Sequence, residues 1–106
     1  MDIREIKFLA LQYRALLIKN NIQPDIIILF GSHAKGTSHK DSDIDLAIVS
    51  RGFGGDPGKE SQKLNLIAYE IPAPLEVIPI SLKDYMQKST SSPILDQIFK
   101  TGIVLF

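Results

Sequence analysis

Two acidic residues, Asp43 and Asp45, are separated by one residue at the start of an apolar run that ends at Val49. If this run is a β-strand, alternate side chains share a face, and the two carboxylates lie about 7 Å apart at their Cα atoms. Carboxylates this close raise each other's pKa unless a cation neutralises them, and hard oxygen ligands favour magnesium. Two magnesium ions about 3.5–4 Å apart can stabilise the attacking and leaving oxygens of phosphoryl-type transfer. The pair therefore predicts a catalytic magnesium site.

A third acid, Glu76, lies inside another short apolar run, residues 75–80. If the two runs form neighbouring strands, Glu76 can share the face of the aspartate pair. There it could bind a metal and accept a proton from an attacking hydroxyl. The alternative is a solvent-exposed acid on an edge strand, and Pro79 in the same run favours an edge position.

A glycine-serine pair, Gly31 and Ser32, follows the isoleucine-rich run of residues 25–30. Gly31 lets the backbone pass close to a phosphate, and the amide and hydroxyl of Ser32 can donate to it. Lys35 adds a positive charge for the phosphates of a nucleotide, and Ser42 is a further candidate ligand. Alone, Gly-Ser is a turn and Asp-x-Asp is an acidic strand end. Their combination favours a metal–nucleotide site.

Neither histidine has the sequence spacing of a metal site. We expect His33 to lie in a loop near the phosphates and His39 to be exposed.

Apolar residues at spacings of three and four predict a helix over residues 2–20, with Asp2 and Glu5 forming a capping box. Phe8 and Leu9 widen its apolar stripe, so we expect more than one side of this helix to be covered. Strands are predicted over residues 25–30, 43–50 and 75–80, and the first is apolar on both faces, as in an interior strand. Shorter helices are predicted at Ala34–Gly36, after Asp56-Pro57, after Ser81 and after Ser92-Pro93, with residues 103–106 a strand or an extended tail.

The composition fits one domain over residues 1–106. The absence of cysteine excludes disulfides and thiolate metal sites, and there is no apolar run of the ~20 residues that a membrane helix needs. The N-terminus lacks the form of a signal peptide, so we expect a cytoplasmic protein. Lys plus Arg equals Asp plus Glu, at 12 each, which argues against direct nucleic-acid binding and leaves homo- or hetero-oligomers open.

Residues 29–49, LFGSHAKGTSHKDSDIDLAIV, resemble the signature of nucleotidyltransferases of the DNA polymerase β type. The chain is similar in size to the minimal nucleotidyltransferases, the antitoxins of HEPN–MNT pairs, and its final SPILDQIFKTGIVLF also resembles how those proteins end. The resemblance implies an α/β (α+β) nucleotidyltransferase fold, a small mixed sheet flanked by helices. It also implies magnesium, with two ions, and ATP as substrate.

The activity that the resemblance implies is transfer of AMP to a hydroxyl, with pyrophosphate leaving. In the paired systems the acceptor is a tyrosine of the HEPN toxin, an RNase that the modification silences. By position, Gly31 and Ser32 hold the phosphates, Asp43 and Asp45 hold metal, and Glu76 is the third acid.

Two positions depart from the family pattern, which often has arginine where this chain has Lys35 and aspartate where it has Glu76. Larger relatives that modify antibiotics carry a second, helical domain for the acceptor. This chain has no room for one, so we expect the acceptor on another polypeptide. The alternative is an antitoxin-like binding module, weakly active or inactive, that neutralises its partner by covering it. A third possibility, nucleotide addition to RNA, predicts a basic face that the balanced charge disfavours.

Overall fold

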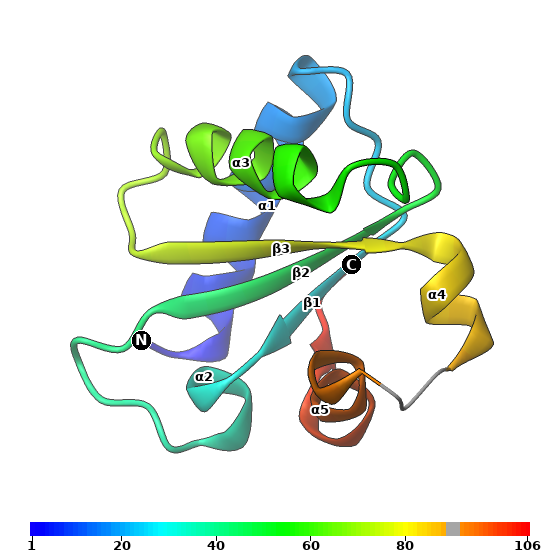
Figure 1. The fold of residues 1–106 in the computed structure, drawn as a ribbon. Helices are drawn as coiled ribbons and strands as arrows, with labels where there is room; N and C mark the ends of the chain where they lie inside the picture. Colours follow the sequence, from blue (N-terminus) through cyan, green and yellow to red (C-terminus); the bar gives the residue numbers. More distant parts are fainter. Residues whose placement is uncertain (89–91) are drawn as a thin grey trace.

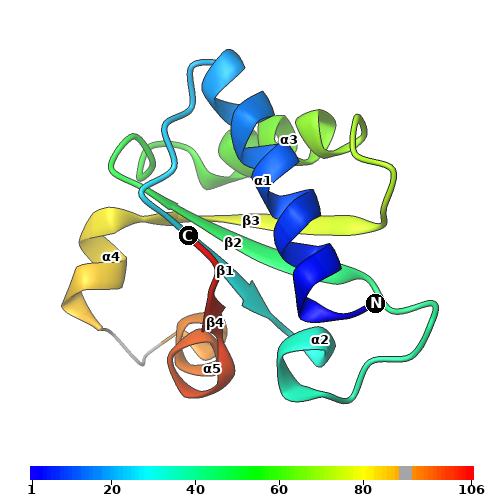
Figure 2. The ribbon, with the colours of Figure 1, turned by 180° about the vertical axis from the view of Figure 1, so that it is seen from behind.

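Helices cover both faces of a mixed β-sheet (Figures 1 and 2). The computed structural model describes residues 1–88 and 92–106. The helices in these residues are α1 Ile3–Lys19, α2 Ser32–Lys35, α3 Pro57–Ala68, α4 Leu82–Gln87 and α5 Pro93–Thr101. The strands are β1 Ile26–Phe30, β2 Ile44–Ser50, β3 Leu75–Ser81 and β4 Ile103–Val104. None of the described helices is long and apolar enough to cross a membrane.

The strands are hydrogen-bonded in the order β3-β2-β1-β4. β1 runs antiparallel to both β2 and β4, whereas β2 and β3 are parallel. A parallel pair needs a crossover, and α3 supplies it. The predicted mixed sheet is confirmed, and the third predicted strand lies beside the second, which was the condition for placing Glu76 with the aspartate pair.

Two apolar layers hold the helices on the sheet. Figure 1 shows α1 and α3 on one side of the sheet and α4 and α5 on the other. The sheet side chains under α1 and α3 are Ile27, Leu29, Ile44, Leu46, Ile48 and Val77. Those under α4 and α5 are Ile28, Phe30, Ala47, Val49 and Ile80. β1 therefore contributes to both layers, as its unbroken apolar run predicted.

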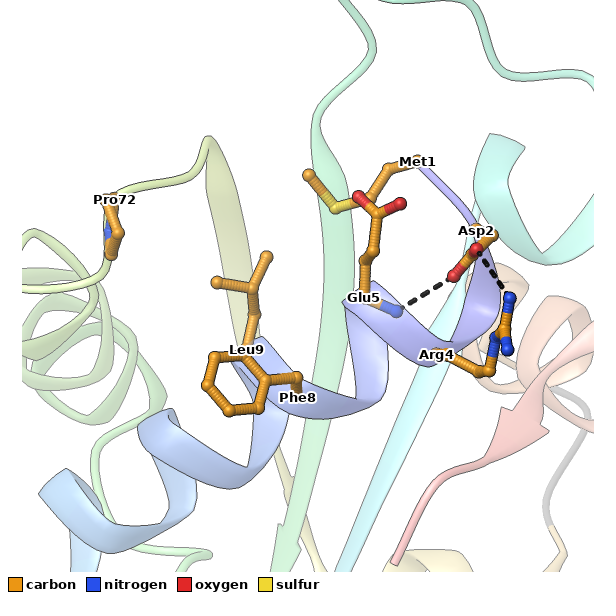
Figure 3. Close-up of a pocket in the computed structure, with 7 residues that line it drawn as sticks. All are labelled: Met1, Asp2, Arg4, Glu5, Phe8, Leu9 and Pro72. Carbon is orange, nitrogen blue, oxygen red and sulfur yellow. Dashed lines mark hydrogen bonds and ion pairs between the residues drawn. The ribbon is translucent and has the colours of Figure 1, made fainter.

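The first predicted helix is confirmed, and its covered side extends from the buried stripe to Leu9 but not to Phe8. The Asp2 carboxylate accepts a hydrogen bond from the Glu5 amide, 3.0 Å away, and begins the helix. The Tyr13 hydroxyl is buried and donates to the Leu64 carbonyl oxygen at 2.7 Å, which joins α1 to α3. Phe8, expected to widen the buried stripe, is 63% exposed. The expectation was wrong for Phe8, which no described residue covers, but it holds for Leu9, which is half-buried and packs against the core under α1 and α3 (both side chains are drawn in Figure 3).

Some element boundaries differ from the predictions. α2 begins at Ser32 instead of Ala34, because the Gly31 carbonyl already accepts bonds from the amides of Ala34 and Lys35. β2 begins at Ile44, so Asp43 lies just before the strand and not inside it. Of residues 103–106, predicted as a strand or an extended tail, Ile103–Val104 form a short strand and the last two residues lie beyond it.

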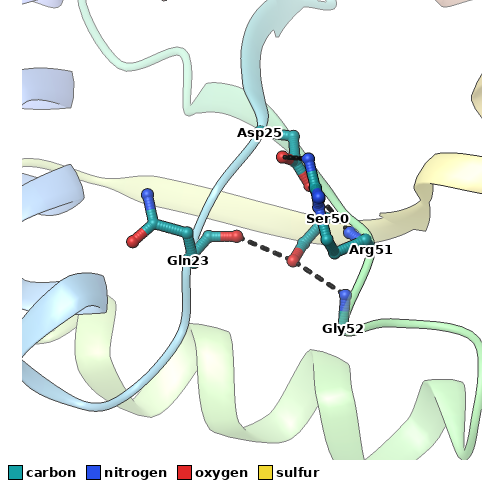
Figure 4. Close-up of polar contacts among 5 residues, drawn as sticks. All are labelled: Gln23, Asp25, Ser50, Arg51 and Gly52. Carbon is teal, nitrogen blue, oxygen red and sulfur yellow. Dashed lines mark hydrogen bonds and ion pairs between the residues drawn. The ribbon is translucent and has the colours of Figure 1, made fainter.

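Side-chain contacts connect the start of β1 to the end of β2, at the end of the sheet away from the acidic residues (Figure 4). The buried Ser50 hydroxyl donates to the Gln23 carbonyl at 2.8 Å and accepts from the Gly52 amide at 3.1 Å. The Arg51 guanidinium pairs with Asp25 at 3.0 Å. The hydrogen bond from the Arg51 side chain is the main cause that lowers the pKa of Asp25. The connection from α1 into β1 is thereby tied to the end of β2.

One side chain, Asn65 of α3, forms hydrogen bonds with the backbone of the edge strand β3. Its amide nitrogen donates to the Val77 carbonyl at 2.8 Å, and its oxygen accepts from the Val77 amide at 3.0 Å. An edge strand otherwise presents unpaired backbone groups to solvent or to other chains. Asn65 therefore fixes β3 at the residue that follows Glu76.

We expect Asn65→Ala to lower the free energy of unfolding by about 1–3 kcal/mol, because it leaves the Val77 amide and carbonyl without partners. Gln62→Ala, at an exposed position on the same helix, is the matched control. Chemical denaturation of both variants measures the difference. Equal stability of the two variants would contradict the role given to Asn65.

Candidate functional site

The sheet brings the predicted acidic residues to one end. Asp45, the second residue of β2, is the register partner of Glu76 in β3. Partners in neighbouring parallel strands place their side chains on the same face, with strands about 4.8 Å apart. Asp43 directly precedes β2 and is exposed, as is Glu76, whereas Asp45 is half-buried. The sequence predicted this juxtaposition only on condition that the two strands are neighbours, and that condition holds.

The charge on Asp45 is disfavoured by its surroundings. Burial is the largest cause that raises its pKa, followed by the negative charges of Glu76 and Asp43. The charge of His33 acts in the opposite direction and is weaker. A bound cation would relieve all three unfavourable effects at once, which is the electrostatic property expected of a metal ligand.

Gly31 allows the Asp45 carboxylate to reach its position. Its backbone has φ 73° and ψ −155°, a conformation essentially restricted to glycine. A Cβ atom at this position would overlap the Asp45 carboxylate oxygen Oδ2. The glycine was predicted to let the backbone approach a phosphate. The contact with Asp45 is a second reason for glycine at this position, and no sequence pattern predicted it.

The loop before Asp43 is held against α2. The His33 Nε2 atom lies 3.3 Å from the Ser42 carbonyl oxygen. The Ser42 hydroxyl accepts from the His39 amide at 2.9 Å, and the Ser42 amide donates to the His39 carbonyl at 3.0 Å. The prediction that His33 lies in a loop was wrong, because α2 begins at Ser32 and includes it, whereas His39 is exposed as expected. The Ser42 hydroxyl takes part in this turn, and its role in nucleotide binding stays a prediction.

The two polar residues of α2 that were predicted to bind phosphate are both accessible. Within the described residues, the Ser32 hydroxyl forms no hydrogen bond and Lys35 forms no ion pair. Both groups are therefore free to contact a ligand beside Gly31. Their roles as phosphate ligands remain predictions.

The donor set fits magnesium chemically, although it is not gathered into a closed site. Across residues 1–88 and 92–106, no group of three or more His, Asp or Glu side chains is close enough to hold a metal ion. Asp43, Asp45 and Glu76 nonetheless supply carboxylate oxygens, the ligand class that magnesium prefers. The exposed Asp43 and Glu76 side chains have room to turn toward Asp45. The assignment of these three acids as metal ligands stays a prediction.

In sequence, residues 15–106 match the family described as "Polymerase beta, Nucleotidyltransferase". No curated protein matches the chain. A crystal structure of a toxin–antitoxin with AMP-PNP is similar, with a TM-score of 0.59 and 25% identity over 94% of this chain and 72% of that one. Two mutants of the MntA–HpeT toxin–antitoxin share the fold at 24% identity. Their TM-scores are 0.59 and 0.57, and the matches cover 90% of this chain and 69% and 70% of theirs.

The family match covers most of the chain, so the chain belongs to the polymerase beta nucleotidyltransferase family. This confirms the family resemblance that was predicted from residues 29–49. The fold of this family is confirmed as well, by the mixed sheet and its flanking helices.

We expect Gly31→Ala to weaken binding of magnesium-ATP at least about tenfold, because the new methyl group displaces the Asp45 carboxylate. Gly36→Ala is the matched control, since Gly36 has nearly the same φ, 74°, but nothing within 4 Å of the added Cβ. Isothermal titration calorimetry measures both affinities. Equal affinities for the two variants would show that the Gly31–Asp45 contact does not matter for the site.

Asp45→Asn is expected to raise the thermal stability of the protein at pH 7, because it removes a disfavoured charge. Since the folded-state pKa of Asp45 is raised above 3.8, the wild type gains stability as pH falls through that pKa. The difference in melting temperature between the variant and wild type therefore decreases as the pH falls. Melting temperatures from pH 7 to pH 3 test this, with Asp41→Asn in the exposed loop as control. A variant no more stable than wild type at pH 7 would contradict it.

Proposed function

We propose that this chain is a magnesium-dependent nucleotidyltransferase that transfers AMP from ATP to a tyrosine hydroxyl of a partner HEPN toxin. The observation that carries the proposal is the register of Asp45 with Glu76, at the sheet end where Gly31 and Ser32 lie. Membership of the nucleotidyltransferase family supports the reaction class. Similarity to a toxin–antitoxin crystallised with AMP-PNP supports both an adenine nucleotide and a toxin partner.

Each residue of the site has a role in this reaction. Gly31 and Ser32 bind the triphosphate, with the Ser32 hydroxyl donating to a phosphate oxygen and Lys35 neutralising its charge. Asp43, Asp45 and Glu76 would hold the magnesium ions, which supply charge neutralisation and orientation of the phosphates when bound. The contact with Gly31 fixes the Asp45 carboxylate against the turn, so that the acids and the phosphate-binding residues keep one geometry.

The chemistry is a substitution at the α-phosphorus of ATP. The acceptor oxygen forms a bond to this phosphorus while the bond to the bridging oxygen of the β-phosphate breaks and pyrophosphate leaves. The proton of the acceptor hydroxyl passes to Glu76, which acts as general base. Glu76 suits this role because it is exposed at the edge of the sheet, where an acceptor from another protein can reach it.

One observation favours the second candidate function, a binding module that neutralises its partner by covering it. The acids in the described residues are not gathered into a metal site. A module of this kind would need the partner-binding surface of the domain but not the three carboxylates.

Transfer of label separates the two functions. The purified chain is incubated with magnesium, ATP labelled at the α-phosphate and its proposed HEPN partner. We expect label on a partner tyrosine, and a loss of about 100-fold or more in Asp43→Asn and Glu76→Gln. Asp41→Asn, in the exposed loop outside the three acids, is expected to retain the transfer rate.

Three results would contradict the proposed reaction. Label from the γ-phosphate on the partner would indicate a kinase, and label on added RNA would indicate nucleotide addition to RNA. Neutralisation of the toxin that survives in Asp43→Asn without any label would favour the covering function instead.

A further inference from the structure

Asp43 lies just outside the strand that follows it, so the sheet alone does not fix its position. β2 begins at Ile44, and the Asp43 side chain is exposed. In the peptide group after Asp43, the Ile44 amide donates to the Pro74 carbonyl oxygen at 2.8 Å. In the peptide group before Asp43, the Ser42 carbonyl oxygen lies 3.3 Å from the His33 Nε2 atom. These two contacts hold the backbone on either side of Asp43, and His33 makes the first of them.

The chemistry of the contact with Ser42 determines which ring nitrogen of His33 carries a hydrogen. A carbonyl oxygen only accepts hydrogen bonds, so the Nε2 atom must be the donor. The neutral ring protonated at Nε2 and the positively charged ring both make this bond, so it does not depend on the charge of His33. While Nε2 donates to Ser42 it has no lone pair for a metal ion. His33 is therefore a hydrogen-bond donor to the loop and not a metal ligand through this atom.

His33 belongs to the same helical turn as the residues predicted to bind phosphate. The Gly31 carbonyl oxygen accepts from the Lys35 amide at 3.1 Å, and the Ser32 carbonyl oxygen accepts from the Thr37 amide at 3.0 Å. These bonds join residues 31–37 into one unit directly after β1. Figures 1 and 2 both show α2 and the loop that follows it at the end of the sheet where β2 begins. The His33 ring connects this unit to the end of that loop.

The two aspartates of the site are held in different ways. Asp45 is positioned by β2 itself and by its contact with Gly31. Asp43 precedes the strand and needs another support, which the hydrogen bond from His33 supplies. The charge of His33 also acts on Asp45, so the ring lies near both acids. Groups that orient the ligands of a metal commonly affect its affinity nearly as much as the ligands do.

We infer that His33 is a positioning residue of the magnesium site, whose Nε2–H group holds the peptide group before Asp43 so that the Asp43 carboxylate can join Asp45 at the metal. This inference deepens the proposed function and rests on it for the identity of the metal and the nucleotide. His33 itself touches neither of them. Its hydrogen bond keeps the metal-binding loop at a fixed separation from the turn that binds the triphosphate.

Substitution of His33 tests this through the affinity for magnesium-ATP, measured by isothermal titration calorimetry. His33→Leu removes the donor, and we expect at least about tenfold weaker binding. His33→Gln is expected to restore the wild-type affinity, because its side-chain amide donates from about the position of Nε2. His39→Leu is the matched control, the same change at the other histidine, whose exposed ring does not contact Ser42, and it is expected to bind like wild type.

Titration of ATP in EDTA separates an effect on the metal ligand from a general effect on the phosphate-binding turn. We expect no difference between wild type and His33→Leu without magnesium, because the bonds within residues 31–37 do not involve the His33 ring. Thermal melting checks that each variant is folded. If His33→Leu does not fold, His33→Asn replaces it, since the shorter amide ends before it reaches Ser42 and the same loss is expected.

Each contrary result has a distinct meaning. Equal magnesium-ATP affinity of wild type and His33→Leu overturns the inference and leaves the proposed function standing. The inference is also overturned if His33→Gln binds as weakly as His33→Leu, if His39→Leu loses as much affinity, or if the loss is as large in EDTA. Wild type that binds no ATP in the presence of magnesium overturns the proposed function and the inference together.

Discussion

The structure depends on one constraint, a carboxylate that is held where its charge is disfavoured. Asp45 is half-buried, it faces the negative charges of Glu76 and Asp43, and its Oδ2 atom occupies the space that any side chain at Gly31 would need. Burial and like charge both raise its pKa. A cation would compensate this arrangement, and under the proposed function that cation is a magnesium ion bound with the nucleotide. The glycine, the aspartate and the glutamate therefore form one unit.

The rest of the fold keeps that unit in place. The parallel pairing of β2 and β3 sets Asp45 beside Glu76, and α3 both makes this pairing possible and closes the edge of β3 through Asn65. At the far end of the sheet, the Ser50 and Arg51 contacts fix the start of β1 and the end of β2. Near the acids, His33 holds the loop before Asp43 against α2. Helix α1 supports the sheet with one side and leaves Phe8, Leu11 and Ile18 of the other side exposed.

The main strands and the acidic residues of the site could be predicted from the sequence, because local patterns encode them. The apolar run before Gly31, the alternation after Asp43 and the single acid at Glu76 predicted the strands and the acids that they carry. Side-chain contacts over long sequence separations could not be predicted this way. From the sequence, Asn65 is an ordinary polar helix residue, because its role depends on a contact with Val77, twelve residues away in β3. Phe8 reads as a core residue, because periodicity does not tell which apolar side of a helix is covered.

The central claim is that Asp43, Asp45 and Glu76 bind magnesium together with the phosphates of ATP above Gly31 and Ser32. A crystal structure of the chain grown with magnesium and a non-hydrolysable ATP analogue tests it most directly. We predict metal density within coordinating distance of all three carboxylates and the triphosphate against the glycine-serine turn. A nucleotide bound elsewhere, or a metal that Asp45 and Glu76 do not coordinate, would contradict the account.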